Sequence, residues 1–325
     1  MPTTHSQQPM ALKKAPLSET EKATTVSCCI AGHYIRLHFT GDGNGMHLLP
    51  SMQGFICPDN CAESNALLFS LTIDDTLRPA KDKQLIRKFD TGNGDTVVHR
   101  LSNGGYQYII RDIAGNDCCL LITDRTFQHC HCALNGDWIM RSFGLNNALM
   151  LAYAFAGSYH QTLLIHASAT MMHHPTLGAV GFPFTAASGT GKSTHTSLWL
   201  KHIEGAELLN DDNPVLRIID GTPYIYGSPW SGKTPCYRNR RARLGAVTHI
   251  ERAPANSMER LGPVQAFAAL LPACSSMKWD EELHQNQCDT ITAIIETTPI
   301  YTLHCLPDQE AAQLSHKTLM APWRT

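Results

Sequence analysis

The sequence has few charged residues and no long uninterrupted apolar stretch. Charged side chains make up 17% of the 325 residues, which argues against long disordered or charged tails. The net charge of −2 lacks the basic excess that a broad nucleic-acid footprint requires. No apolar run approaches the ~20 residues of a membrane span, and residues 1–25 lack the apolar centre of a secretory signal. We therefore expect a cytoplasmic protein with neither nucleic-acid nor membrane partners.

The cysteines do not have the spacing of a disulfide scaffold, although there are twelve of them. In a reducing cytosol they would be thiols, many of them buried as small apolar residues. The densest group of possible metal ligands is His129-Cys130-His131-Cys132. In a strand its histidines would point to one face and its cysteines to the other, so one tetrahedral ion could not easily collect all four. A structural metal at this segment is the less favoured interpretation.

The chain divides into a β-rich part and a mixed part. Hydrophobic residues make up 43% of the chain, which supports a real core and one large or two moderate domains. We predict a loose leader over residues 1–24, an antiparallel β-rich accessory or recognition domain over 25–142, and a mixed α/β domain over 143–325. The first domain has candidate strands at Val26–Phe39, Gly54–Cys57, Ala66–Ile73, Gln84–Asp90, Thr96–Leu101, Tyr106–Asp112, Cys118–Asp124 and Thr126–Ala133. The fold class is therefore α+β.

The second part alternates short apolar strands with helices. A helix rich in alanine and leucine, Leu145–His160, is expected to join the two parts. Candidate strands follow at Leu163–Thr170, Gly178–Phe184, Glu207–Leu209, Pro214–Ile219, Tyr224–Tyr226, Leu244–Glu251 and Ile300–Cys305. Further helices are expected from Gly262 to Leu271, from Asp280 to Glu296 and from Asp308 to Leu319, with Asp308 as the N-cap of the last.

The most informative segment is Ala187-Ser188-Gly189-Thr190-Gly191-Lys192-Ser193-Thr194. It lies between the apolar run 177–184 and the amphipathic run 194–203, which is the strand, glycine loop and helix arrangement that wraps nucleotide phosphates. Lys192 can reach the β and γ oxygens, and the Ser193 hydroxyl can ligate Mg²⁺. The usual pattern is G-x-x-x-x-G-K-[ST], and Ala186 stands where its first glycine would be. An ordinary surface turn is the less favoured alternative.

Two adjacent acids follow the loop at a distance typical of phosphoryl-transfer sites. Asp211 and Asp212 end the segment Leu208-Leu209-Asn210-Asp211-Asp212, about 20 residues after Lys192. Carboxylates at the C-terminal end of a strand lie where open α/β sheets bind nucleotides. One acid can hold Mg²⁺ or its water shell, and the other can take the proton of an attacking hydroxyl. The alternative is a solvated turn.

Two further features contribute candidate residues. His166 lies inside the short apolar strand expected upstream of the loop, where it could hydrogen-bond an aspartate or a phosphate oxygen. The segment Gly227–Pro235 is rich in glycine and proline, and cationic residues at Lys233, Arg238, Arg240 and Arg241 lie in it or just after it. A basic loop of this kind suits a γ-phosphate or an anionic acceptor, with Lys233 and Arg238 preferred. A buried structural histidine and an ordinary basic surface loop are the alternatives.

Together these residues resemble one known family. The run Ser188–Thr194, with His166 upstream and Asp211-Asp212 downstream, resembles the C-terminal domain of HPr serine kinase/phosphorylase over roughly residues 160–320. That family shares its nucleotide-binding core with ATP-dependent phosphoenolpyruvate carboxykinase. The resemblance implies that Ser188–Thr194, namely Ser188, Gly189, Thr190, Gly191, Lys192, Ser193 and Thr194, cradle the phosphates. It also implies that Ser193 and Asp212 serve Mg²⁺, and that Asp211 is the general base supported by His166.

The implied activity is Mg-ATP-dependent phosphorylation of a hydroxyl on a protein serine or a small molecule. Lys192 would offset the γ-phosphate charge, and Lys233 or Arg238 would stabilise the transferring group. The resemblance also makes a homo-oligomer conceivable, because related kinases assemble. Two alternatives stay open: a nucleotide-sensing module without transferase activity, and a carboxykinase-like lyase. The residues do not determine the acceptor, the donor nucleotide or which aspartate has which role.

Overall fold

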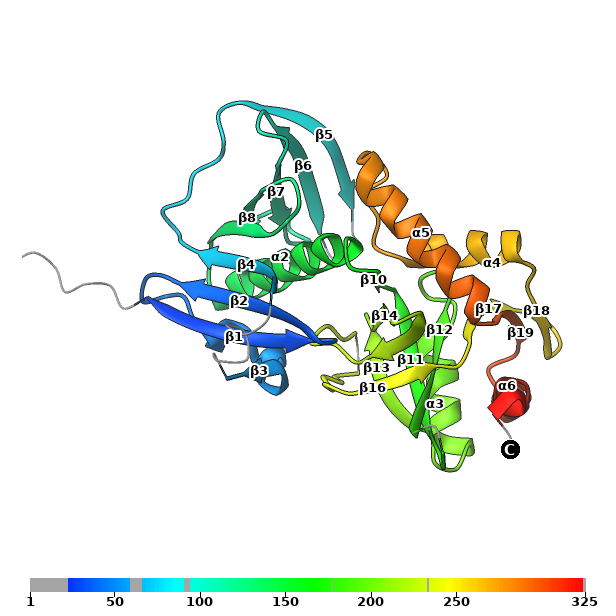
Figure 1. Cartoon of the computed structure of the whole chain (residues 1–325). Helices are drawn as coiled ribbons and strands as arrows, with labels where there is room; N and C mark the ends of the chain where they lie inside the picture. The colour runs from blue at the N-terminus through cyan, green and yellow to red at the C-terminus, as the bar shows by residue number, and fades with distance from the viewer. Residues whose placement is uncertain (1–22, 59–65, 91–93, 177, 233, 324–325) are drawn as a thin grey trace, which may run out of the picture.

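The computed structural model describes residues 23–58, 66–90, 94–176, 178–232 and 234–323. Over these residues the protein is a mixed α+β molecule with two large sheets and a small number of helices (Figure 1). Most of the expected leader therefore lies outside the described residues, as does Lys233.

The first sheet has the strand order β3-β1-β2-β4-β9-β8-β7-β6-β5. Its strands are β1 (Thr24–Ile30), β2 (His33–Phe39), β3 (Ile56–Cys57), β4 (Leu67–Ile73), β5 (Lys83–Asp90), β6 (Asp95–Leu101), β7 (Tyr106–Arg111), β8 (Asp117–Thr123) and β9 (His129–Leu134). The 3₁₀ turns η1 (Met46–Leu48) and η2 (Pro50–Phe55) precede β3. Because β4 pairs in parallel with both β2 and β9, the sheet is mixed, and the prediction of an antiparallel domain was wrong in this respect.

Two of the predicted strands in this sheet also differ. The single strand expected over 26–39 is a hairpin, because Ala31 and Gly32 turn the chain with φ angles of 50° and 75°. Of the strand expected at 54–57, the first two residues belong to the 3₁₀ turn η2, and Ile56–Cys57 forms β3, which pairs with β1. In β9 the two cysteines are buried and the two histidines exposed, the alternation that a strand imposes.

Helix α2 (Trp138–Ser158) packs against the first sheet, where it buries side chains such as Leu145, Leu149 and Tyr153. It begins at Trp138 because the Asp137 side chain accepts a hydrogen bond from Met140 N at 3.0 Å, which caps its first turn. The helix therefore starts earlier than the expected 145, and it lies across the domain boundary expected at 142.

The second sheet has the order β10-β14-β15-β16-β12-β17-β19-β18, and β11 joins β12 to β13. Its strands are β10 (Thr162–Leu164), β11 (Ala167–His174), β12 (Gly178–Thr185), β13 (Glu207–Asp212), β14 (Val215–Ile219), β15 (Thr222–Tyr226), β16 (Arg241–Leu244), β17 (Val247–Arg252), β18 (Ser257–Arg260) and β19 (Ile300–Cys305). Strands β12, β17 and β19 are parallel, and β13 runs in the same direction because β11 is antiparallel to both β12 and β13. Their C-terminal ends therefore share one edge.

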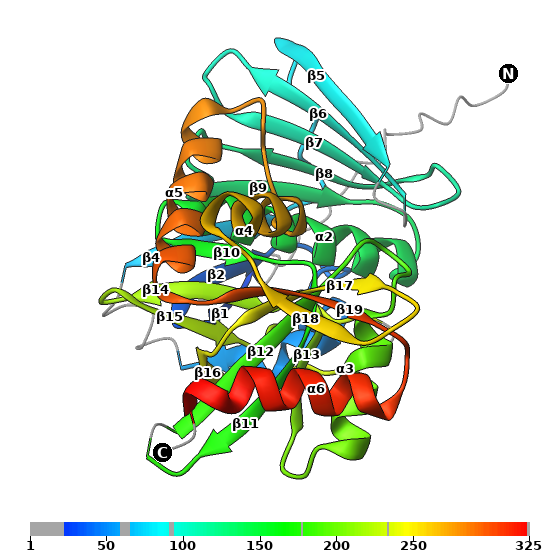
Figure 2. The same cartoon turned by 90° about the vertical axis from the view of Figure 1, so that its right-hand side faces the viewer.

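Helices cover both faces of this second sheet (Figure 2). They are α3 (Lys192–His202), α4 (Pro263–Leu270), α5 (Glu281–Thr297) and α6 (Gln309–Met320), with the 3₁₀ turns η3 (Leu271–Ala273) and η4 (Ala321–Trp323). One core packs α4 and α5 residues such as Leu270 and Ile291 against the sheet. The other packs Trp199 of α3 and Leu319 of α6 against Phe182 and Phe184. Within the described residues, no helix combines the length and apolarity that crossing a membrane needs.

Candidate functional site

The glycine loop has the structural context that the motif requires. Strand β12 ends at Thr185, residues 186–191 form the loop, and α3 begins at Lys192. Gly189 and Gly191 have φ angles of 75° and 131°, conformations that favour glycine. Gly191 is the N-cap of α3 and supplies no side-chain capping bond, so donors of the first turn are open to an anion.

The Lys192 side chain lies half-buried between the loop and the paired acids. Its Nζ donates to the carbonyl of Ala186 at 3.4 Å. Burial lowers the pKa of Lys192, and the charges of Asp212 and Asp211 act in the opposite direction. The ammonium group therefore lies close enough to both carboxylates for their negative charges to stabilise its protonated form.

Asp211 forms a pair with the first serine of α3. The Ser193 hydroxyl donates to Asp211 Oδ1 at 2.9 Å, and Asp211 is only 3% exposed. The other carboxylate oxygen accepts from Thr234 N at 3.4 Å. The Asp211 carbonyl accepts hydrogen bonds from the Ser231 hydroxyl at 3.0 Å and from Gly232 N. These bonds hold the loop that follows β15 against the C-terminal end of β13.

Asp212 forms a separate pair with His166. Asp212 Oδ1 lies 3.1 Å from His166 Nε2, and its other oxygen accepts from Asn213 Nδ2 at 2.7 Å. The pairing of β11 with β13 sets Ala167 opposite Asp212, which brings the preceding His166 to the acid. Asp212 also has a φ of 130°, which is strained for a residue with a side chain.

The sequence analysis placed His166 inside a strand, and this prediction was wrong. The apolar segment 163–170 is divided into β10 and β11, and His166 occupies the break between them. Its backbone N–H donates to the carbonyl of Ala273 at 2.7 Å, and 47% of its side chain is exposed. The histidine is therefore accessible from solvent and from ligands.

Within the described residues, two arginines of the basic loop form ion pairs with Glu207 and do not contact the glycine loop. Arg238 Nη1 and Arg240 Nη1 lie 3.1 Å and 2.7 Å from Glu207 Oε2, at the start of β13 and away from its acidic end. Arg241 stacks on the ring of Tyr224 with 5.2 Å to the ring centroid. The structure therefore does not bring Arg238 to the glycine loop, and Lys233 lies outside the described residues.

Sequence reasoning missed two residues that shape the site. Arg252 donates to the loop carbonyls of Thr190 at 3.0 Å and Gly189 at 2.6 Å. The buried Asn210 donates to the Trp230 carbonyl at 3.0 Å and accepts from Asn213 N at 2.9 Å. Asn210 follows the apolar pair Leu208-Leu209, and Arg252 is the last residue of β17, so both stand near the C-terminal ends of strands in the same sheet, and that position was the available signal.

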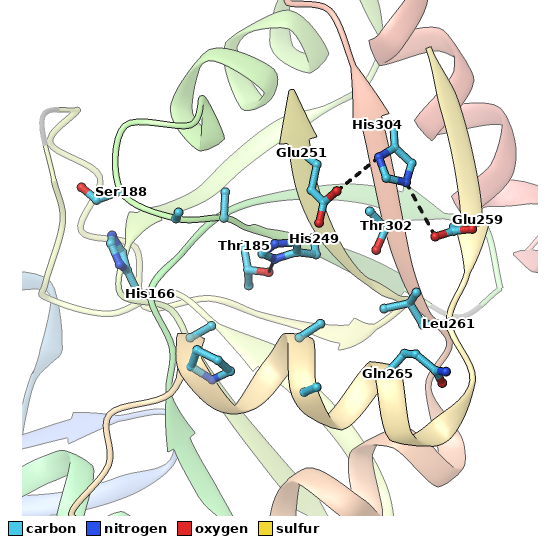
Figure 3. Close-up of a pocket in the computed structure, with 16 residues that line it drawn as sticks. His166, Thr185, Ser188, His249, Glu251, Glu259, Leu261, Gln265, Thr302 and His304 are labelled. Atoms are coloured by element: carbon cyan, nitrogen blue, oxygen red, sulfur yellow. Dashed lines mark hydrogen bonds and ion pairs between the residues drawn. The ribbon is translucent and has the colours of Figure 1, made fainter. Parts of the chain in front are cut away.

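Two hollows flank the loop on opposite faces of the sheet. The hollow beside α3 has a volume of about 510 Å³ and is lined mainly by apolar side chains, among them Leu198, Ile250, Leu306 and Pro307. The hollow beside α4 has a volume of about 680 Å³ and extends from His166 and Ser188 to His304 (Figure 3). Alternation along β17 turns Ile250 to the first and His249 to the second.

Comparison with known proteins found no family model that matches the chain. No curated protein matches its sequence either.

Proposed function

We propose that the protein is a magnesium-dependent phosphotransferase that moves the γ-phosphoryl group of ATP to a hydroxyl group. One observation carries the proposal: the two adjacent acids at the end of β13 have different partners. Asp211 pairs with Ser193 at 2.9 Å and Asp212 with His166 at 3.1 Å, beside the glycine loop. A metal-holding acid and a proton-accepting acid are the two functions that such a transfer needs.

Ser193 and Asp211 fit a magnesium ion. Their oxygens lie 2.9 Å apart, and hydroxyl and carboxylate oxygens are the ligands that Mg²⁺ prefers. Among the described residues there is no group of three or more His, Cys, Asp or Glu placed to hold a metal. This suits an ion that takes one or two protein ligands and completes its shell with phosphate and water. When bound, the ion would offset phosphate charge.

The glycine loop, Lys192 and the hollow beside α3 suit the nucleotide. The backbone N–H groups of the loop and the first turn of α3 would bind the phosphates, and the Lys192 ammonium would balance their charge. The apolar lining provided by Leu198, Ile250 and Pro307 suits a purine ring. Arg252 holds the loop by two of its carbonyls, which limits the rearrangement needed on binding.

The surroundings of Asp212 favour it as the general base. Its side chain is 37% exposed, whereas Asp211 is buried against Ser193. His166 orients the Asp212 carboxylate, and the acceptor proton passes to that carboxylate as the acceptor oxygen attacks the γ-phosphorus. This allocation is the reverse of the one that the resemblance implied, in which Asp211 is the base and Asp212 serves the metal.

The direct test replaces Lys192 and measures both nucleotide binding and turnover. We expect Lys192→Ala to lower magnesium-dependent ADP formation about 100-fold or more, because the γ-phosphoryl group loses the positive charge that balances it during transfer. Lys201→Ala is the matched control, since Lys201 is an exposed lysine on the same helix. Undiminished turnover by Lys192→Ala would contradict the proposal. Magnesium-dependent binding without turnover on any acceptor would instead assign the nucleotide-sensing role.

A further inference from the structure

The hollow beside α4 opens directly onto the catalytic side of the proposed site. His166, which pairs with Asp212, forms one end of it together with Ser188 of the glycine loop. The hollow then runs between α4 and strands β17 and β19 (Figure 3). A molecule lying in it would have one end beside the general base and the other end farther along the sheet.

Polar groups line the sheet side of this hollow. His249 and Glu251 of β17, with Thr302 and His304 of β19, alternate onto the same face. His304 Nδ1 lies 3.3 Å from Glu251 Oε2, and its Nε2 lies 3.6 Å from Glu259 Oε1. The α4 side presents the small residues Ala268 and Ala269, which leave the space open. The hollow is therefore a formed pocket in which His304 and Glu259 lie at the end away from Ser188, and Glu251 lies between that end and the glycine loop (Figure 3).

The charge of the pocket points to a cationic occupant. Its described lining includes Glu251 and Glu259 but neither lysine nor arginine. The two carboxylates, whose side chains are 53% and 64% exposed, lie around one histidine and would repel a phosphate or carboxylate ligand and attract an ammonium group. These acids do not form a metal-binding group within the described part of the chain, so an organic cation fits them better than a metal ion.

We propose that this pocket binds the acceptor, and that the acceptor is a small hydroxylated amine such as an amino alcohol or amino sugar. The proposal rests on the phosphotransferase function. A volume of about 680 Å³ lies in the range of small-molecule sites, which favours a small acceptor over a serine on a folded protein. The ammonium group lies by Glu251 and Glu259, and the hydroxyl lies at the His166 end.

The transfer step balances with ATP as the donor. The acceptor oxygen forms a bond to the γ-phosphorus, and the bond between that phosphorus and the β–γ bridging oxygen breaks. The bridging oxygen keeps the electron pair and leaves as ADP, while the hydroxyl proton passes to Asp212. The products are a phosphate monoester that retains its amine, ADP and one proton.

The test compares matched acceptors on the full-length protein. ADP formation is measured with ethanolamine and glucosamine, and with ethylene glycol and glucose as the counterparts that lack the amine. A serine-containing peptide is included as a third class. We expect at least a tenfold higher rate with an amine than with its neutral counterpart. Equal rates within both pairs, a preference for the peptide, or nucleotide binding without turnover on either amine would overturn the pocket assignment.

Variants of the pocket separate this assignment from the function itself. We expect the double variant Glu251→Gln, Glu259→Gln to raise the KM for the amine about tenfold or more, with the ATP affinity unchanged. Glu296→Gln is the control, because Glu296 is exposed on α5 and does not line the pocket. An unchanged KM in a double variant that unfolds at the wild-type temperature would overturn the pocket assignment while leaving the phosphotransferase function standing. If the wild-type protein does not bind ATP in the presence of magnesium, both the pocket assignment and the phosphotransferase function are overturned.

Discussion

At the scale of single residues, the two adjacent aspartates show how one strand can present two identical side chains to different partners. Successive side chains of a strand point to opposite faces, so Asp211 reaches Ser193 while Asp212 reaches His166. One carboxylate is buried and the other is partly open to solvent. Their identical side chains therefore differ in what they can contact.

Substitution of each aspartate by asparagine should separate the roles. We expect Asp212→Asn to lower kcat about 10²- to 10⁴-fold with little effect on ATP binding, because an amide cannot accept the acceptor proton. Asp211→Asn should instead raise the magnesium concentration needed for half-maximal activity, because the amide is a weaker ligand. Magnesium titrations of the steady-state rate distinguish the two effects. The opposite pattern would restore the allocation drawn from the sequence resemblance.

The backbone of Asp212 gives a second prediction at this scale. Its φ of 130° costs a residue with a side chain about 1–3 kcal/mol, and glycine adopts that angle freely. We expect Asp212→Gly to be about 1 kcal/mol more stable than the wild type in urea denaturation while losing transfer activity. Asp220→Gly is the control, because the φ of Asp220 is 48°, within the ordinary left-handed region. A destabilised Asp212→Gly would contradict the presence of stored strain.

At the scale of elements, aspartates cap three of the described helices, and one of them does more. Asp137, Asp280 and Asp308 accept from the backbone N–H three residues later, at 3.0, 3.0 and 2.9 Å. Asp280 is buried, with 7% of its surface exposed, and it also accepts a hydrogen bond from the Tyr106 hydroxyl of the first sheet. This cap therefore links α5 to β7.

Removing these caps should have unequal effects. Asp137→Ala, at an exposed cap, should lower the free energy of unfolding by about 1 kcal/mol. Asp280→Ala should lower it by about 2–4 kcal/mol, because the buried Tyr106 hydroxyl also loses its acceptor. Chemical denaturation of the two variants side by side measures the difference. Equal losses would mean that the contact between α5 and β7 adds nothing to the cap.

Local signals predicted the elements best where a glycine loop or a capping residue marks the end of a strand or the beginning of a helix. The glycine loop between β12 and α3 and the capped helix α6 were predicted within a few residues, and both depend on local chemistry. The hairpin at Ala31-Gly32 was missed, although its signals are local: Gly32 is a turn residue, and the buried positions Cys28 and Ile30 of β1 give way to Ile35 and Leu37 of β2, a change of phase. The parallel pairing of β4 with β2 and β9 joins distant segments, and no local pattern specifies it.

The same distinction explains the site. The sequence identified Lys192, Ser193, both aspartates and His166 as candidates, because motif spacing is local. Which aspartate meets which partner depends on the register of β11 against β13, which sets Ser168 opposite Asp211 and Ala167 opposite Asp212. The destination of Arg238 depends on Glu207, an ion pair between segments 31 residues apart. Such pairings follow from tertiary structure.

At the scale of the whole molecule, the two sheets share a continuous core. The core of the first sheet and α2 also includes Leu164, Val215 and Trp230 from the second part. The rings of Tyr153 and Trp230 lie 5.3 Å apart. Polar contacts cross the same boundary, since Arg217 Nη1 donates to the Ala31 carbonyl at 2.7 Å. The two sheets should therefore depend on each other for stability.

His33 makes this shared boundary sensitive to acid. Its Nε2 lies 2.8 Å from the Thr162 hydroxyl, across the junction between β2 and β10. Burial, followed by the charges of Arg217 and His160, lowers the pKa of His33 from 6.5 to about 3. Below pH 6.5 the unfolded chain therefore binds a proton that the folded protein does not bind until about pH 3.

Stability should consequently be fully present above pH 6.5 and fall as the pH is lowered towards 3. The contribution of His33 to this fall is about 1.4 kcal/mol per pH unit once the unfolded histidine is protonated. Urea denaturation at intervals between pH 7.5 and 4.5 measures the slope. His33→Gln should reduce the slope by about that amount whatever its stability at pH 7.5, whereas His47→Gln, at an exposed position, should leave it unchanged. An undiminished slope in His33→Gln would place the acid sensitivity elsewhere, and the buried His195, whose pKa burial lowers to about 4, would be the next histidine to replace.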